Sequence, residues 1–386
     1  MKKVVSILLV LVMAFGLLAG CSSGSQASAS PSPSAAASAS PTAKTSGFKI
    51  GMCTANFGNT WCAQFVSDFE KRADEYKAEG ILADYQVATV SADLTDQINQ
   101  CNAMINSGID ALLIWCVSPT GVKPIVDLAL ENNVMVIISN ENAAYEGTYS
   151  IIGNNYGFQD ILTKWLAAQL PNGGNIVSIT GVDGFDANTV RQQAVSDVLS
   201  KSPNIKTLAS APGNWSTTTA QSVMSTFLST YGNKIDGVLT QDVMADGILK
   251  AYENANVKPK LMTGDYTKSY LKSWAALPDL KSISVTYDPG IIVTCLDVAV
   301  NLLAGKTFKD GMLEPNPLDS SLVNTVTVNP GFVVTKEGDS TASWMQGYTG
   351  TKAITLDKAL DMLKDSEDTA ALDGYLSRDE VNAWFK

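Results

Sequence analysis

Short apolar runs alternate with helix-type patterns from about residue 47 onward, and this alternation limits the possible fold more than any other feature. The runs at 111–115 and 134–138 are apolar at nearly every position, whereas a half-exposed strand would alternate apolar and polar residues. Continuous apolarity is typical of parallel strands that helices cover on both faces. The sequence therefore predicts an α/β protein with doubly wound parallel sheets.

The alternation forms two successive arrays, and each array predicts one lobe. In the first array, Trp61, Phe65, Phe69 and Ala73 form an i, i+4 stripe, which indicates a helix with one buried face. Ligands of such sheets bind beyond the carboxyl ends of the strands, so we expect a site in the loops that follow them. The expected strands lie at 48–53, 85–90, 111–115 and 134–138 in the first array and at 175–179, 205–209, 237–240, 261–264 and 283–286 in the second.

The first 46 residues predict export and a membrane anchor. The basic start Met1-Lys2-Lys3 and the apolar run 4–18 are typical of an export signal, and the run is shorter than the about 20 residues of a membrane-spanning helix. Leu18-Ala19-Gly20-Cys21 resembles the lipobox of bacterial lipoproteins, which implies a signal peptide at 1–20 and a lipidated Cys21. An ordinary secretory signal with an incidental cysteine is the alternative. Residues 21–46 are rich in Ser, Ala and Pro, so we expect a solvated tether at the extracytoplasmic face of the cell membrane.

The composition excludes several classes of function. The formal net charge is −11, and it becomes −13 once Lys2 and Lys3 are removed, which argues against binding to nucleic acid. The absence of histidine excludes Ser-His-Asp and Cys-His catalysis and histidine metal sites, and we expect no metal and no cofactor. Disulfides are left open among the cysteines other than Cys21, which are Cys53, Cys62, Cys101, Cys116 and Cys295.

Two local motifs fail when their spacing is checked. Gly305-Lys306-Thr307 lacks the earlier glycine of a phosphate loop, because position 300 is valine. The segment 369–380 lacks carboxylates at the first positions of a calcium loop. Ser377 and Glu380 instead have the spacing of a capping box at the start of a final helix.

Several short segments follow the expected strands in an order that characterises one family. The chain resembles the type I periplasmic sugar-binding proteins of ABC importers, in particular the ribose- and xylose-like group, from about Phe48 to Lys336. The resemblance rests on Asn59-Thr60-Trp61, Gly108-Ile109-Asp110, Ser139-Asn140-Glu141, Gly181-Val182-Asp183-Gly184, Arg191, Asn214-Trp215, the segment 241–247, Thr263-Gly264-Asp265 and Tyr287-Asp288-Pro289.

The resemblance implies two doubly wound parallel-sheet lobes joined by three hinge crossings. We expect 47–140 and about 288–325 to form an N-terminal lobe, and 141–287 and about 330–386 to form a C-terminal lobe, on which the segment beyond Thr335 packs as a C-terminal extension that exceeds the minimal family fold. The resemblance also implies a monomer that closes over a sugar and delivers it to an ABC permease in the membrane, without catalysing a reaction.

A sugar presents apolar C–H faces and a rim of hydroxyl groups, which aromatic rings and polar side chains can bind. Trp61, Trp215 and Tyr287 each follow an expected strand, although core packing is the alternative role for Trp61 and Trp215. Position in the strand-end loops, together with the resemblance, gives a set of candidate ligand-binding residues. They are Asn59, Trp61, Ser118, Asn140, Glu141, Asn188, Arg191, Trp215, Gln241, Asp265 and Tyr287.

The chain departs from the family pattern at charged positions. Asn140 and Glu141 stand where ribose-like members have Asp-Arg, and Ser118 stands where they have an aspartate. Arg191 matches an arginine that is more often structural than ligand-binding. These departures imply that an anionic ligand is disfavoured and that a neutral sugar is expected, with an amino-bearing or polyol ligand left open.

Two other functions remain as alternatives at this stage. A receptor that presents its liganded form to a membrane sensor kinase or chemoreceptor would use the same lobe closure. A surface glycoside hydrolase would need paired carboxylates, for which Asp183 and Asp186 are the candidates.

Overall fold

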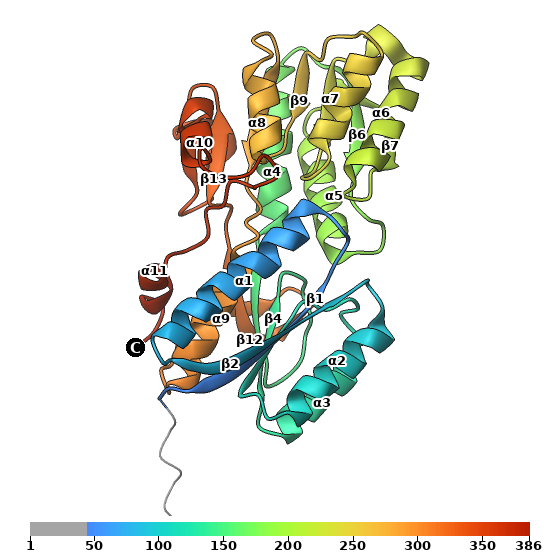
Figure 1. Ribbon diagram of the computed structural model, residues 1–386. Coiled ribbons are helices and arrows are strands. Elements are labelled where there is room, and N and C mark those ends of the chain that lie inside the picture. Colours follow the sequence, from blue (N-terminus) through green and yellow to red (C-terminus); the bar gives the residue numbers. More distant parts are fainter. Residues whose placement is uncertain (1–44) are drawn as a thin grey trace, which may run out of the picture. The chain divides into compact units, whose positions relative to one another are not determined.

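The computed structural model describes residues 45–386 and contains two seven-stranded sheets with helices on their faces (Figure 1). The expected signal peptide, Cys21 and most of the expected tether lie outside the described residues. The two doubly wound lobes predicted from the apolar runs are confirmed. Each expected strand is present, usually with one to three additional residues at an end.

The first sheet has the order β11-β12-β5-β4-β3-β1-β2. Its strands pair in parallel except at the edge, where β11 is antiparallel to β12. Its strands are β1 (Phe48–Ala55), β2 (Leu82–Val90), β3 (Ala111–Ile114), β4 (Met135–Ser139), β5 (Tyr149–Gly153), β11 (Glu314–Asn316) and β12 (Asp319–Val328).

The second sheet has the order β14-β13-β10-β9-β8-β6-β7. Its strands are parallel except that β13 runs antiparallel to β10. Its strands are β6 (Gly174–Thr180), β7 (Ile205–Pro212), β8 (Gly237–Thr240), β9 (Leu261–Thr263), β10 (Lys281–Val285), β13 (Phe332–Thr335) and β14 (Lys352–Thr355).

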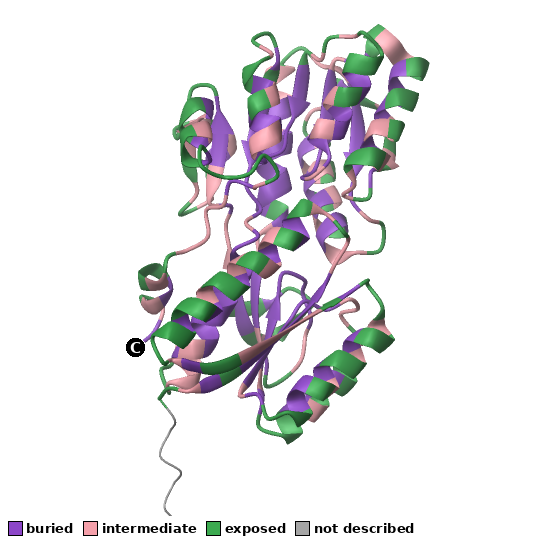
Figure 2. Cartoon of the chain, viewed as in Figure 1, coloured by how far each residue is buried: buried purple, intermediate pink, exposed green. Residues whose placement is uncertain are grey.

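The helices cover both sheets with their apolar faces inward, so that buried residues concentrate along the strands and exposed residues on the outer helix faces (Figure 2). The first lobe carries α1 (Thr60–Ala78), α2 (Leu94–Asn106), α3 (Lys123–Glu131), α9 (Ile291–Leu303) and α11 (Arg378–Asn382). The second lobe carries α4 (Asn155–Gln169), α5 (Asp186–Leu199), α6 (Thr217–Tyr231), α7 (Ala245–Asn254), α8 (Lys268–Ala275) and α10 (Leu356–Met362), with short 3₁₀ turns at Gly232–Lys234 and Ser343–Met345.

Helix α1 shows how the sequence pattern produces this packing. Its predicted stripe is buried, with Phe65, Phe69 and Ala73 fully shielded from solvent. Along β1 the side chains alternate between the two faces of the sheet, so that Met52 packs on the side of α1 and Cys53 on the side of α2 and α3. The first sheet is therefore covered on both faces, as its continuous apolar runs predict.

The cysteines of the first lobe lie in this core without being linked. Among residues 45–386, Cys53, Cys62, Cys101, Cys116 and Cys295 are all buried free thiols. The question left open by the sequence is thus answered for the described residues, which contain no disulfide.

The boundary between the lobes differs from the expected one. Strand β5 pairs in parallel with β4 and joins the first sheet, so the first lobe continues to Gly153 and does not end at residue 140. The chain then crosses between the lobes at residue 154, at 286–290 and at 329–331, which gives the three hinge crossings. Asp288 in the second crossing accepts hydrogen bonds from the N–H of Gly331 in the third crossing (2.9 Å) and of Gly374 near the C-terminus (2.8 Å).

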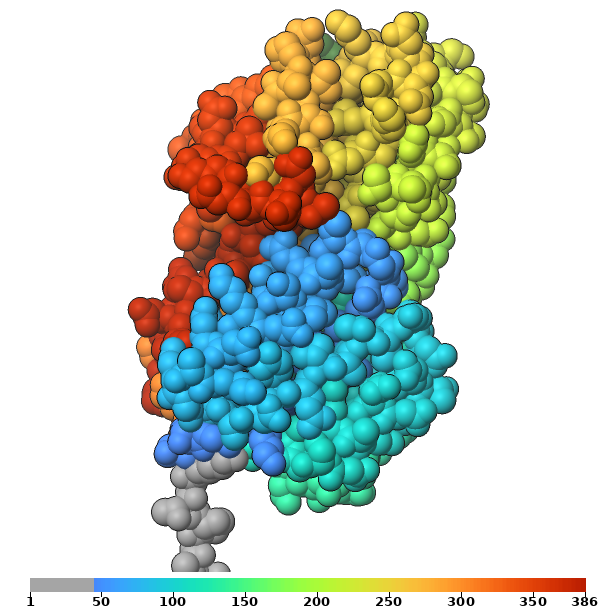
Figure 3. Space-filling view, viewed as in Figure 1, coloured from blue at the N-terminus to red at the C-terminus, as the bar shows by residue number. Residues whose placement is uncertain are grey.

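The C-terminal segment, residues 364–386, does not stay on the second lobe as expected. It leaves α10 and passes α1, where the Ala371 N–H donates to Gln64 Oε1 (2.8 Å). It ends in α11 against α9, where the Lys309 N–H donates to the Trp384 carbonyl (2.8 Å) (Figures 1 and 3). The capping box of Ser377 and Glu380 is confirmed at the start of α11. This segment makes a fourth connection between the lobes, which β14 and α10 anchor to the second sheet.

Candidate ligand-binding site

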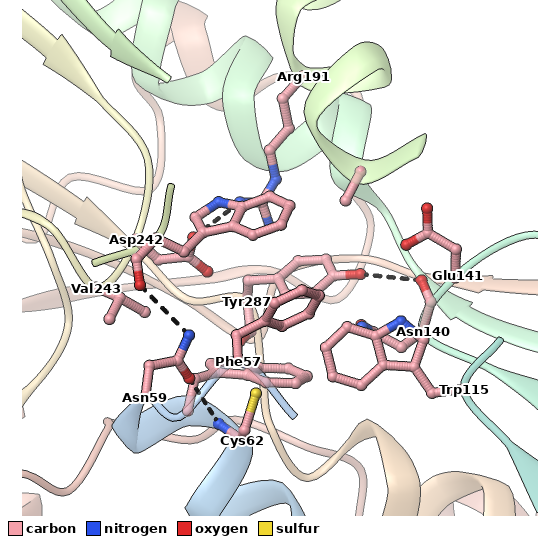
Figure 4. Close-up of a pocket in the computed structure, with 13 residues that line it drawn as sticks. Phe57, Asn59, Cys62, Trp115, Asn140, Glu141, Arg191, Asp242, Val243 and Tyr287 are labelled. Carbon is pink, nitrogen blue, oxygen red and sulfur yellow. Dashed lines mark hydrogen bonds and ion pairs between the residues drawn. The ribbon is translucent and has the colours of Figure 1, made fainter. Parts of the chain in front are cut away.

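A cavity lies where loops from the two lobes meet (Figure 4). Its walls come mainly from loops that follow β1, β3 and β4 of the first sheet and β7, β8 and β10 of the second, as expected for parallel sheets. Seven of the candidate residues line it: Asn59, Trp61, Asn140, Glu141, Arg191, Trp215 and Tyr287.

The other four candidates lie behind or beside this wall. Gln241 Oε1 accepts from Trp215 Nε1 (2.8 Å), and its amide nitrogen donates to Asn188 Oδ1 (2.8 Å), so both amides support the tryptophan from behind. The Asp265 carboxylate turns inward and accepts from the Tyr266 N–H (2.8 Å). Ser118 Oγ accepts from the Gly121 N–H (3.1 Å) within its own turn.

The sequence reasoning missed six residues that line the cavity, which are Phe57, Cys62, Trp115, Ala187, Asp242 and Val243. Phe57, Trp115 and Asp242 each lie within two residues of a strand end, which is the same signal that identified Gln241. That signal could have found them. Ala187 and Val243 carry no chemical signal in the sequence.

Aromatic rings form most of the cavity wall. Trp61 stacks on Tyr287 (centroids 5.9 Å apart, interplanar angle 29°), and its edge meets Trp115 (5.6 Å, 79°). Trp61 Nε1 also donates to the Tyr287 carbonyl (2.7 Å), which joins the first lobe to the second hinge crossing. From the first lobe, Phe57 contacts the edge of Trp215 in the second (5.9 Å). The cavity therefore has aromatic surface on both sides.

Trp215 is held in an unusual position by its surroundings. Its backbone φ is 48° and that of Asn214 is 58°, in the left-handed region that non-glycine residues seldom adopt. The indole packs directly on Gly181, where an added Cβ would lie 2.4 Å from the ring. Glycine at 181 and the amide of Gln241 thus fix the indole against the cavity.

Arg191 brings a positive charge to the cavity wall, but this charge is paired. Its guanidinium donates to Asp242 Oδ1 (2.8 Å) and to Asn155 Oδ1 (2.9 Å). It also lies over the rings of Phe158 (4.3 Å) and Tyr287 (4.7 Å). Because the Asp242 carboxylate balances the guanidinium, the cavity offers little net attraction to an anionic ligand.

Glu141 is the second ionisable group at the wall, and only 2% of its surface is exposed. Burial, and after it the nearby charge of Asp186, raise the pKa of its carboxyl to about 7. The N–H groups of Asp186 and Ala187 partly offset these effects. Glu141 therefore titrates near neutral pH when the lobes are in contact.

Two buried polar atoms of the wall have no hydrogen-bond partner within the described protein. They are Trp115 Nε1, a donor, and Asn140 Oδ1, an acceptor, and both residues are 5% exposed. Buried polar groups are nearly always paired, so these two atoms are open to a partner in the cavity, which a ligand or a water molecule can supply. A hydroxyl group both accepts and donates, and it can satisfy an atom of either kind.

The described residues also limit other chemistries. Among residues 45–386 no group of His, Cys, Asp or Glu side chains is arranged to hold a metal ion. No helix in the described part of the chain is long and apolar enough to cross a membrane.

Comparison with known proteins identifies the family. Residues 50–307 match the family model described as a periplasmic binding protein domain. The chain belongs to this family.

Curated relatives of this periplasmic binding protein match about half of its length. A xylitol-binding protein of Mycolicibacterium smegmatis is 31% identical over 201 residues, which cover 50% of this chain and 56% of the relative. A galactofuranose-binding protein of Escherichia coli is 24% identical over 182 residues, which cover 44% of this chain and 56% of the relative. The matches thus span little more than half the length of these relatives.

Solved structures share the fold over a larger part of the binding protein. An ABC transporter solute-binding protein from Thermobispora bispora superposes with a TM-score of 0.70 at 20% identity, over 87% of this chain and 94% of that chain. The myo-inositol-binding protein of Caulobacter gives 0.64 at 20% identity, over 79% of this chain and 99% of that chain.

The carboxylates considered for a hydrolase do not face the cavity. Asp186 accepts from Asn142 Nδ2 (2.9 Å), and Asp183 accepts from Asn188 Nδ2 (3.4 Å). Neither carboxylate lines the wall. Asp183 and Asp186 therefore do not supply a carboxylate pair at the cavity wall, where the two carboxylates are Glu141 and Asp242.

Proposed function

We propose that this chain is a lipid-anchored, extracytoplasmic solute-binding protein that captures a neutral sugar or polyol between its lobes and delivers it to an ABC permease. The observation that carries the proposal is the cavity between the lobes, with its aromatic wall, its unpartnered donor and acceptor, and its paired charge. The protein acts as a monomer that catalyses no reaction.

The physical chemistry of the cavity supports a polyhydroxylated ligand. Trp61, Trp215 and Tyr287 supply apolar aromatic surface that can contact the C–H groups of a sugar or an extended polyol. Trp115 Nε1 and Asn140 Oδ1 gain partners when hydroxyl groups occupy the cavity. The Arg191 guanidinium is already paired with Asp242, so it is not free to bind a carboxylate or a phosphate of a ligand.

The names of the relatives support the same class of ligand. Xylitol, galactofuranose and myo-inositol are all neutral and carry several hydroxyl groups. Each of the relatives reported above is named as a binding protein. We place the ligand of this chain in the same class without assigning one compound.

A thermal-shift panel tests the ligand class. Because a ligand that binds only the folded state raises Tm, neutral compounds such as xylitol, myo-inositol and galactofuranose are compared with matched carboxylates such as xylonate. We expect at least one neutral compound to raise Tm and its carboxylate to have no effect at equal concentration. A rise with the carboxylates alone would contradict the proposal.

The lipid anchor is tested separately. The Leu18–Cys21 tetrad and the Ser-, Ala- and Pro-rich tether support attachment through Cys21. We expect Cys21→Ser to move the protein from the membrane fraction to the soluble extracytoplasmic fraction. The variant Cys62→Ser, in the folded part, should leave the distribution unchanged. Equal membrane retention of Cys21→Ser and wild type would contradict lipidation.

Solute uptake distinguishes transport from signalling. In cells that lack the protein, transport predicts loss of uptake of the bound solute. A sensor-kinase role would instead abolish the transcriptional response and leave uptake intact.

A further inference from the structure

Helix α5 of the second lobe begins without a cap of its own. Its N-cap residue is Phe185, which makes no side-chain hydrogen bond to the helix. The first N–H groups of a helix have no partner within the helix and need an acceptor from elsewhere. At the start of α5 this acceptor comes from the other lobe.

The acceptor is Glu141, in the loop that follows β4 of the first lobe. Its Oε1 accepts from the Asp186 N–H at 2.6 Å, and the Ala187 N–H contributes a second interaction with the same carboxylate. The partial positive charge of the helix N-terminus offsets part of the cost of burying this carboxylate. Glu141 therefore caps α5 across the gap between the lobes.

The next residue adds a second bond between the same two elements. Asn142 Nδ2 donates to Asp186 Oδ2 at 2.9 Å. Asn142 is 8% exposed, and neither Asn142 nor Asp186 lines the ligand cavity. This bond is therefore separate from any contact with a ligand.

These side chains are directed toward the other lobe and not toward their own. Within the described residues, the side-chain hydrogen bonds of Glu141 and Asn142 all go to α5. Asn142 Oδ1 is buried without a partner, so this amide gains no other bond by lying where it does. Burying these polar groups costs free energy, and the contacts to α5 offset that cost.

We propose that Glu141 and Asn142 form an interlobe latch that closes on the N-terminus of α5 when the lobes come together over the cavity. The latch rests on the proposed function, since it regulates the closure of the same site. Glu141 lines the cavity and holds α5 at once, so it links ligand capture to closure. Asn142 and Asp186 are positioning residues.

The size of the effect follows from ordinary hydrogen-bond energies. A net contribution of about 0.5–1.5 kcal/mol for one bond changes the ratio of closed to open protein roughly two- to tenfold. The Asn142–Asp186 bond is the part of the latch that can be removed without touching the cavity wall.

The test measures the distance between the lobes by double electron–electron resonance. Spin labels are placed at Gln100→Cys on α2 and Thr226→Cys on α6, which are exposed, whereas the native cysteines are buried. The distance distribution is recorded with no added solute and with saturating xylitol. The measurement without added solute does not depend on which solute the protein binds. A failure of the latch is therefore distinguishable from a failure of the proposed function.

Four variants are compared in this background. We expect Asn142→Ala and Asp186→Ala each to lower the closed-to-open ratio about two- to tenfold, and the double variant to lower it no further. Asp186→Asn keeps an acceptor oxygen and should retain the closed population. Circular dichroism checks that each variant is folded.

Two results would overturn the latch. One is an equal closed fraction in the wild type and both single variants, both without added solute and with xylitol. The other is an additive loss in the double variant, because residues that act through one shared bond are not additive.

Discussion

At the scale of single residues, the cavity wall contains backbone conformations that a chain adopts only under constraint. Asn140, Trp215 and Val243 have φ values of 64°, 48° and 66°, and valine is especially unfavourable there because its side chain is branched at Cβ. Each such residue costs of order 1–3 kcal/mol, and the conformation persists only because the surroundings enforce it. All three line the cavity, so the strain is concentrated where the side chains must be aimed.

These conformations also explain which site residues could be predicted. Periodicity locates the ends of strands, and Trp61, Trp215 and Tyr287 followed from that position. The direction of a side chain depends on the loop backbone, which no local pattern specifies. Asp265 ends a strand as expected but turns inward to the Tyr266 N–H. Trp115 went unnoticed because it reads as the end of an apolar run.

The Trp215 indole should dominate ligand affinity. Removing an aromatic face that is worth about 2–3 kcal/mol should weaken binding by roughly 30- to 150-fold in Trp215→Ala. Fluorescence or calorimetric titration of the ligand found in the panel measures this change. Trp384→Ala is the matched control, because Trp384 lies in the C-terminal segment and away from the cavity. Full affinity in Trp215→Ala would contradict the site assignment.

Ligand affinity should also depend on pH through Glu141. With the lobes in contact its pKa is about 7, compared with an ordinary 4.5, and we expect opening of the lobes to return the carboxyl to water. The closed state thus binds the proton more tightly, so closure is most favourable below about pH 4.5 and loses this contribution as pH rises through 7. These two pKa values predict that affinity falls by up to roughly 70-fold between pH 5 and pH 8.

The control for this dependence is Glu141→Gln, which keeps an acceptor oxygen and removes the titration. Its affinity should be nearly flat over the same range. A wild-type affinity that rises with pH, or a variant that keeps the wild-type slope, would show that Glu141 is not the group responsible. The charged groups that face Glu141 are Asp186 and Arg191.

At the scale of elements, patterns that repeat were predictable and single connections were not. The βα alternation located the strands because continuous apolar runs have few alternative explanations. Among the residues described, no helix separates β4 from β5, so β5 does not continue the strand–helix alternation of the sequence. The sheet that β5 joins is decided by its pairing with β4, which is a contact that the alternation does not specify. The path of the C-terminal segment likewise depends on long-range contacts such as Ala371 with Gln64.

The end of this segment should depend on the cap of α11. Ser377→Ala removes the capping box with Glu380, and the loss of a cap costs about 1 kcal/mol. We expect amide hydrogen exchange at residues 378–386 to accelerate about fivefold, with little change in the global stability. Ser340→Ala, at an exposed serine that caps no helix, should leave exchange unchanged. Equal exchange in Ser377→Ala and wild type would show that tertiary contacts alone hold α11.

At the scale of the described molecule, four connections join the lobes around one cavity. Asp288 bonds the N–H groups of Gly331 and Gly374, so it ties two hinge crossings to the C-terminal segment. On the cavity side, contacts such as Phe57 with Trp215 and Glu141 with α5 act between the lobes. The residues that line the cavity, those that bond between the lobes and those of the hinge crossings therefore lie in neighbouring parts of the interlobe loops.

The most direct test of the central claim is isothermal titration calorimetry of residues 45–386 against a panel of neutral sugars and polyols, with their carboxylate counterparts as controls. The account predicts saturable one-to-one binding of at least one neutral compound, and weaker or no binding of the matched carboxylate. The absence of binding by every neutral compound, or tighter binding of a carboxylate, would contradict it.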